Sequence, residues 1–114
     1  MTSEKAPDMA TWAAEARHRI QEMRADVGHL SNDISSGNDD SKSLVYVDAD
    51  FLQMARVHQA PDPQVAADWK TMVEDGHQWM SNLRHGSDAG EDQLVVAGRR
   101  LDDDIGLASP AQAG

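Results

Sequence analysis

The sequence has no cysteine among its 114 residues. A chain without cysteine forms no disulfide, supplies no thiolate to zinc and has no thiol nucleophile, so scaffolds and enzymes of those kinds are excluded. It also has no apolar run long enough to span a bilayer, and its first seven residues, MTSEKAP, lack the apolar core of a secretory signal. We therefore expect a cytoplasmic protein that does not bind membranes.

Basic residues are scarce relative to acidic ones. Lys and Arg number 10 and Asp and Glu number 20, so the formal net charge at pH 7 is -10. Proteins that neutralise nucleic-acid phosphates need the opposite balance, and we expect no direct nucleic-acid binding. Hydrophobic residues make up 39% of the chain, enough for one modest core at this length. The excess of Arg over Lys, with abundant Ala and Asp, is typical of GC-rich genomes and indicates a bacterial or phage origin.

Residues 8–34 are expected to form a long helix. Their apolar side chains step by threes and fours from Met9 to Ile34, and Asp8 is placed to cap the first turn. The polar stretch 35–41 then breaks the pattern, because its side chains compete with the helix for backbone hydrogen bonds.

The next segment allows two interpretations. Leu44-Val45-Tyr46-Val47 has the composition of a strand, yet apolar residues from Leu44 onward also fall at helical spacing. We expect a helix, because a lone strand of four residues needs a partner and the sequence shows none. This helix is expected to begin between Ser43 and Ala49 and to end at Pro61.

A third helix is expected to begin at Asp62-Pro63, since a capping carboxylate followed by proline is a strong helix start. It is expected to end at Gly86. Gly76 and Gly98 lie at or beside apolar seams, where glycine lets two helices approach closely, so we expect both to serve packing.

A fourth helix is expected after Asp88, which forms a capping-box pattern with Glu91. Four helices with short connections predict an all-α fold, either a four-helix up-and-down bundle or a helical hairpin completed in a dimer. We expect one helical domain, residues 8–105, between disordered segments 1–7 and 106–114.

The pattern Glu-x-x-His occurs twice, as Glu15 with His18 and as Glu74 with His77. This spacing resembles the ligand pairs of ferritin-like di-metal bundles, and the resemblance implies a metal-binding bundle in which these four residues are ligands. Both pairs point away from the apolar stripe of their helix, and the expected second helix has no Glu. A ferritin-like metal site is therefore an alternative hypothesis, and we expect no cofactor.

Two further spacings resemble known families in part. Tyr46 and Asp50 form Tyr-x-x-x-Asp, which is similar to part of the export signal of small helical proteins secreted by type VII systems, although the Trp-x-Gly turn of that family is missing. Arg24 and His29 match the Arg-x-x-x-x-His spacing of helical HEPN ribonucleases. Export by a type VII system is an alternative hypothesis, whereas the acidic composition argues against RNA cleavage.

The sequence contains no nucleophile elbow, phosphate-binding glycine loop or dinucleotide fingerprint, so we expect that the protein is not an enzyme. The hypothesis that fits best is a non-enzymatic protein–protein interaction module, a homo-oligomer or small adaptor. A phage-type acidic inhibitor that mimics nucleic acid is an alternative. Large side chains on the seams are expected either to fill the core or to anchor a protein partner: Trp12, Met23, Trp69 and Trp79.

Overall fold

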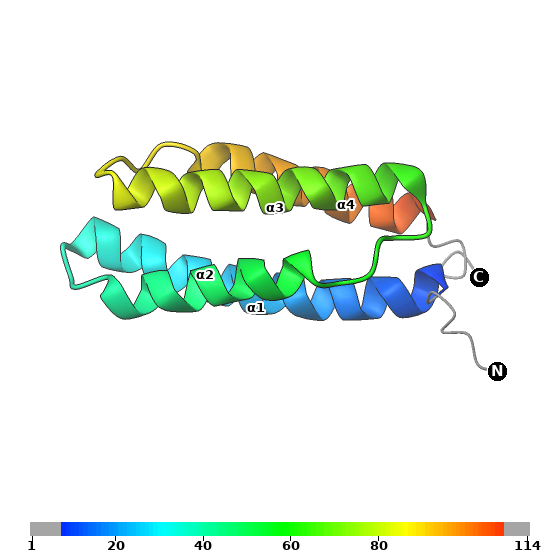
Figure 1. Cartoon of the computed structure of the whole chain (residues 1–114), viewed down its shortest axis with the longest axis horizontal. Coiled ribbons are helices and arrows are strands. Elements are labelled where there is room, and N and C mark those ends of the chain that lie inside the picture. Colours follow the sequence, from blue (N-terminus) through cyan, green and yellow to red (C-terminus); the bar gives the residue numbers. More distant parts are fainter. Residues whose placement is uncertain (1–7, 109–114) are drawn as a thin grey trace.

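A computed structural model describes residues 8–108, which form four α-helices and no strand (Figure 1). The helices are α1 (Met9–Ser36), α2 (Ser41–Ala55), α3 (Pro63–Arg84) and α4 (Glu91–Ala108). The prediction of an all-α fold is confirmed. None of these helices is long and apolar enough to cross a membrane.

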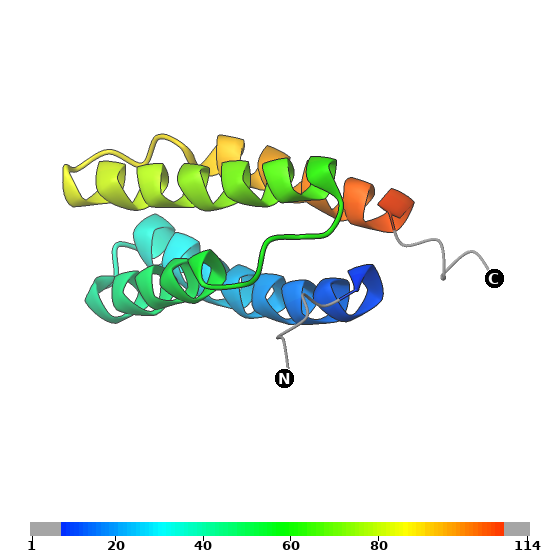
Figure 2. The ribbon, with the colours of Figure 1, turned by 45° about the vertical axis from the view of Figure 1, so that its right-hand side comes forward.

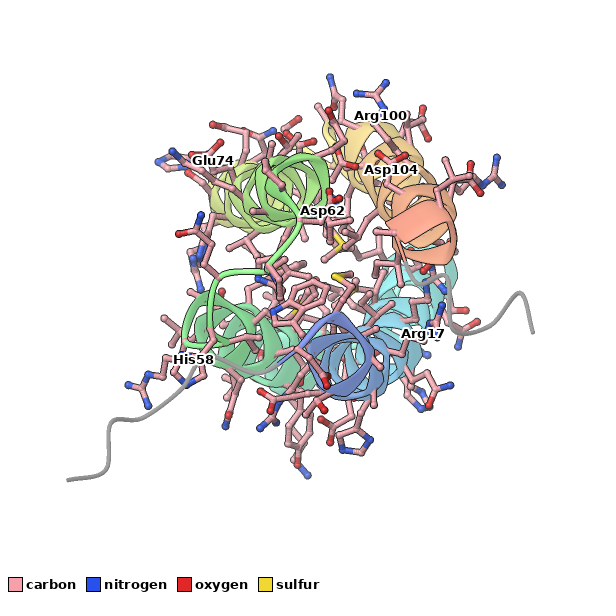
Figure 3. The ribbon with its side chains drawn as sticks, turned by 90° about the vertical axis from the view of Figure 1, so that its right-hand side faces the viewer. Arg17, His58, Asp62, Glu74, Arg100 and Asp104 are labelled. Carbon is pink, nitrogen blue, oxygen red and sulfur yellow. The ribbon has the colours of Figure 1, made fainter. Side chains whose placement is uncertain are left out.

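The helices form two hairpins, α1 with α2 and α3 with α4, stacked as two layers (Figures 1 and 2). Successive helices run in opposite directions along a body of 50 × 33 × 19 Å. Seen along the long axis, α2 lies beside α3 and α1 lies beside α4, and side chains fill the space between them (Figure 3). This arrangement is an up-and-down bundle within one chain.

The starts of α1 and α3 follow the sequence signals. The Asp8 carboxylate accepts a hydrogen bond from the Thr11 backbone N–H at 2.8 Å, and the Asp62 carboxylate accepts one from the Val65 N–H at 3.0 Å. Pro63 occupies the first turn of α3, where a missing N–H leaves no hydrogen bond unmade. Both caps therefore form within three residues of the capping side chain.

The helix α2 begins two residues before the expected range and ends at Ala55, well before Pro61. Segment 44–47 is helical, as expected. Two indole groups hold the end of α2 and the chain that follows it. Trp69 Nε1 donates to the carbonyl of Met54, in the last turn of the helix, at 3.1 Å, and Trp12 Nε1 donates to the carbonyl of His58, beyond the helix, at 2.6 Å. The linker 56–62 then covers the end of the core in place of further helical turns.

The capping box expected at Asp88 is wrong, because α4 begins at Glu91. The preceding loop places Gly90 at φ +109°, and the Leu94 N–H donates to the Gly90 carbonyl at 3.2 Å. Asn82 of α3 holds the loop, donating from Nδ2 to the Ala89 carbonyl at 2.8 Å. A side chain of α3 thus helps to set the path of the loop before α4.

The expected end of the domain is also wrong, because α4 continues through residues 106–108 to Ala108. Segments 1–7 and 109–114, for which disorder was expected, lie outside the described residues.

The core runs along the inside of all four helices. Trp12 and Trp69 pack edge to face, with ring centroids 5.3 Å apart, at the end where the linker crosses. Phe51 fits against Gly76 so closely that a Cβ built on Gly76 would lie 2.2 Å from the Phe51 ring. The predicted packing role of Gly76 is confirmed, and Gly98 is looser, with 3.7 Å between its built Cβ and Arg24.

Candidate interaction surface

The outer side of α2 carries large apolar side chains that the fold leaves exposed. Val45, Tyr46 and Leu52 are 66%, 57% and 57% exposed. Val45, Ala49 and Leu52 are spaced by four and three residues, so they lie on one side of the helix. We call the four residues Val45, Tyr46, Ala49 and Leu52 the α2 face.

The two carboxylates of α2 have partners outside this face. Asp48 pairs with Arg84 of α3, and Asp50 faces Asp26 of α1. Two exposed cations border the face: Lys42 lies three residues before Val45, and Arg56 lies four residues after Leu52. The α2 face is therefore free of carboxylates on a chain whose formal net charge is -10.

A groove of about 600 Å³ adjoins the carboxyl end of α2, between the linker and α3. Ala55, three residues after Leu52, lines its start and extends the α2 face into it. In Figure 3, His58 of the linker and Glu74 of α3 lie on this side of the bundle. The groove is lined by Ala55, Val57, Gln59, Ala60, Pro63, Ala66, Ala67, Trp69, Lys70, Val73 and Glu74.

Exposed apolar residues on α4 have charged neighbours. Val96 is 54% exposed, but it shares a hollow with Asp75, Asp92 and Arg100. Single apolar side chains among charges are ordinary on protein surfaces. Tyr46 of the α2 face also shares a polar hollow, with Asp26 and Lys42 among its lining residues. The α2 face is the stronger candidate for a binding surface because it continues into the groove at Ala55.

The four residues considered as interface anchors lie in the core. Their exposed fractions are 1% for Trp12, 4% for Met23, 7% for Trp69 and 0% for Trp79. Their burial matches the alternative expectation, that they fill the core. The candidate surface on α2 is made by other residues, and of these four Trp69 alone lines the groove.

The sequence contained a signal for the α2 face that periodicity did not reveal. Segment 44–47 has four consecutive apolar residues. Consecutive residues in an α-helix are about 100° apart, so four of them point to every side of the helix. Once this segment is helical, Val47 reaches the core and Val45 and Tyr46 cannot.

The two Glu-x-x-His pairs do not meet within the chain. Glu15 and His18 are exposed on α1, and Glu74 and His77 are exposed on α3, the helix diagonally opposite in the bundle (Figure 3). Within residues 8–108, no three His, Asp or Glu side chains are grouped so that they could hold a metal ion. The arrangement of a ferritin-like centre is thus not formed inside one chain.

The residues of the Tyr-x-x-x-Asp and Arg-x-x-x-x-His patterns do not come together into a site. Tyr46 is exposed on the α2 face, whereas Asp50 is turned toward α1. Arg24 forms an ion pair with Asp102 of α4 at 2.6 Å. His29 instead lines a polar hollow between α1 and α2.

Each hairpin contains two aspartates that face each other across its helices. Asp50 of α2 meets Asp26 of α1; burial, and then the Asp26 carboxylate, raise the pKa of Asp50 to about 7. Asp104 of α4 meets Asp68 of α3, and the hydrogen bond with Asp68 is the main cause that raises the pKa of Asp104. Two carboxyl groups this close share a proton more readily than they both ionise.

The carboxylates as a whole are divided evenly between the two hairpins. Residues 8–60 contain nine Asp and Glu and residues 61–108 contain ten, so neither hairpin concentrates them. A mimic of nucleic acid is expected to gather its carboxylates on one face. This distribution does not favour such a mimic.

No protein-family model, no curated protein and no solved structure matches this chain.

Proposed function

We propose that this protein is a non-enzymatic helical module that binds protein surfaces, in the first place a second copy of itself, through the α2 face and its groove. The observation that carries the proposal is the exposure of Val45, Tyr46 and Leu52 on a side of α2 that is free of carboxylates, in a strongly acidic chain. Burying apolar surface contributes about 25 cal/mol per Å², and a contiguous apolar patch marks interaction sites.

The geometry of α2 suits a two-fold contact, in which both copies use the same patch. An antiparallel pairing centred between Asp48 and Ala49 sets Val45 of one copy opposite Leu52 of the other. Ala49 then lies at the centre, where a small side chain lets the two helices approach closely. Asp48 is already paired with Arg84 within its own chain, so this pairing leaves no free carboxylate in the contact.

The charge of the chain predicts how salt affects this association. Two copies of net charge -10 repel each other, and salt screens that repulsion over a Debye length of about 10 Å at 0.1 M. An apolar contact therefore strengthens as salt rises. A contact held by ion pairs would weaken over the same range.

Sedimentation velocity over a range of protein concentrations tests the proposal. We expect reversible self-association that Leu52→Gln weakens by about 5- to 30-fold, the effect of removing a central apolar contact. Val96→Gln is the matched control, because Val96 is 54% exposed and Leu52 57%. The proposal fails for self-association if the wild type stays monomeric at every concentration. It fails for this surface if both variants weaken association equally.

The same face is available to a different protein if the module is an adaptor. Binding to such a partner is expected to depend on Leu52 and not on Val96, and to persist with the wild-type chain as a monomer. Competition between self-association and partner binding then follows, because both need the α2 face.

A further inference from the structure

The two aspartate pairs occupy equivalent roles in the two hairpins. Asp26 and Asp50 join α1 to α2, and Asp68 and Asp104 join α3 to α4. The members of each pair come from helices that run in opposite directions, so the contact depends on the hairpin being closed. Neither pair belongs to the α2 face.

Each pair contains a buried carboxylate oxygen that lacks a donor. Asp50 Oδ2 and Asp68 Oδ2 are fully buried and accept no hydrogen bond from the described residues. Asp68 is only 6% exposed, and Gln64 donates to its other oxygen at 3.2 Å. A buried acceptor without a donor destabilises the fold, because it has lost its hydrogen bonds to water and gained none in exchange. In each pair, a proton on either carboxyl group lets that group donate a hydrogen bond to the other.

The charged neighbours of the first pair are mostly acidic. On α1, Glu22 adds to the repulsion at Asp50, and Arg19 acts in the opposite direction. On α3, which also packs on α2, Arg84 is taken by Asp48 and His77 packs against the Phe51 ring. No cation of the described residues forms an ion pair with Asp50 itself.

The second pair lies near the end of the molecule shown in Figure 3. Asp62, at the start of α3, adds to the repulsion at Asp104, while Arg100 on the same helix as Asp104 opposes it. From α1, the Arg24 guanidinium is held by Asp102. A proton on one of the two carboxyl groups again replaces the repulsion between Asp68 and Asp104 by a hydrogen bond.

We propose that the two aspartate pairs are proton-uptake sites that fasten each hairpin, so that this protein becomes more stable as its surroundings become more acidic. One proton at each pair turns a repulsion between carboxylates into a hydrogen bond between helices. The stability of the bundle then depends on pH through these partly buried carboxyl groups as well as through the exposed ones.

The sign of the effect follows from linkage. Asp50 has a pKa of about 7 in the folded chain and an ordinary value near 3.9 when unfolded, so between these values the folded chain holds the extra proton. The stabilisation is complete below about pH 4, falls as the pH rises, and is lost above about pH 7. Between pH 5.5 and 7.5 this one site changes the folding equilibrium constant by about 20-fold at most, and solvent screening reduces that to about 5- to 20-fold.

The test compares urea unfolding of the full chain at pH 5.5 and 7.5 for wild type and variants. Asp50→Asn supplies a permanent donor toward Asp26, so we expect it to raise stability at pH 7.5 and to flatten the pH dependence. Asp26→Asn is expected to do the same from the other side. Asp103→Asn removes an equal charge at an exposed position of α4 and is the matched control. For the second pair, we expect Asp104→Asn likewise to raise stability at pH 7.5 and to flatten the pH dependence.

The change in unfolding free energy between the two pH values is compared between wild type and each variant. This difference removes the contribution of the five histidines, a residue type whose ordinary pKa falls in the same pH range. Equal pH slopes in wild type, Asp50→Asn and Asp26→Asn would overturn the proposal for the first pair. If the variants fail to fold, carboxyl carbon NMR of the wild type decides. A titration midpoint near 7 at the Asp26–Asp50 pair supports the proposal, and midpoints near 4 for both groups overturn it.

Discussion

Adding one methyl group at Gly76 tests the closest contact in the core. A Cβ at this position would lie 2.2, 2.3 and 2.7 Å from three atoms of the Phe51 ring, whereas ordinary contacts begin near 3.4 Å. The ring is completely buried, so it must move by about 1 Å against packed neighbours. Overpacking of this kind costs about 1–3 kcal/mol.

Replacing glycine in a helix by alanine also brings a gain of about 1 kcal/mol from backbone propensity. Gly28→Ala isolates that gain, because Gly28 lies inside α1 with nothing within 4 Å of its built Cβ. We therefore expect Gly28→Ala to stabilise the protein by about 1 kcal/mol and Gly76→Ala to destabilise it by up to about 2 kcal/mol. The difference between the two variants measures the Phe51 contact alone.

Urea unfolding followed by tryptophan fluorescence gives both values, at one low protein concentration because association adds to apparent stability. A third variant sharpens the result: in a Phe51→Leu background, where the ring is absent, the penalty of Gly76→Ala is expected to shrink. Equal stabilisation by Gly28→Ala and Gly76→Ala would refute the reasoning and place α2 farther from α3 than the structure has it.

Two other substitutions test the anchors of the linker and of α3. Trp12→Phe replaces the indole by a smaller ring and removes the N–H that donates to the His58 carbonyl, so we expect it to lose about 1 kcal/mol more stability than Trp79→Phe in the same assay. Trp79→Phe is its matched control, because Trp79 Nε1 is buried without a hydrogen-bond partner, and equal losses would contradict the role of the Trp12 bond. Asp62→Ala removes the α3 cap and is expected to cost about 1 kcal/mol, with Asp62→Asn costing less; no loss of helix content or stability in Asp62→Ala would show that the cap is dispensable.

The experiments on Leu52 and Asp50 address different properties of one short helix. Leu52 lies on the exposed side of α2 and bears on association, whereas Asp50 faces α1 and bears on pH-dependent stability. A chain that is strictly monomeric can still show the proton effect. Conversely, a dimer can form with no dependence on the aspartate pairs.

Local signals in the sequence identified the helices and two of their starts. Asp8 and Asp62 each accept from a backbone N–H three residues later, so the interaction is complete within a few residues of chain. The period of apolar residues likewise predicts a helix from neighbours along the sequence. For this reason the all-α fold and the buried tryptophans followed from sequence. The Asp88 cap did not, because the loop around it is held by a residue of the neighbouring helix, Asn82, which donates to the Ala89 carbonyl.

Features that depend on distant residues were decided by the tertiary structure. The helix α2 ends where Trp12 and Trp69 bind carbonyls 46 and 15 residues away along the chain. Likewise, Asp26 and Asp50 are simply two acids in the sequence, and folding makes them a pair. Composition and spacing therefore determined that this protein is an acidic bundle of four helices. Which apolar side of α2 stays exposed, and which carboxylates must share a proton, depended on how the helices pack, because burial and electrostatic interaction act through space.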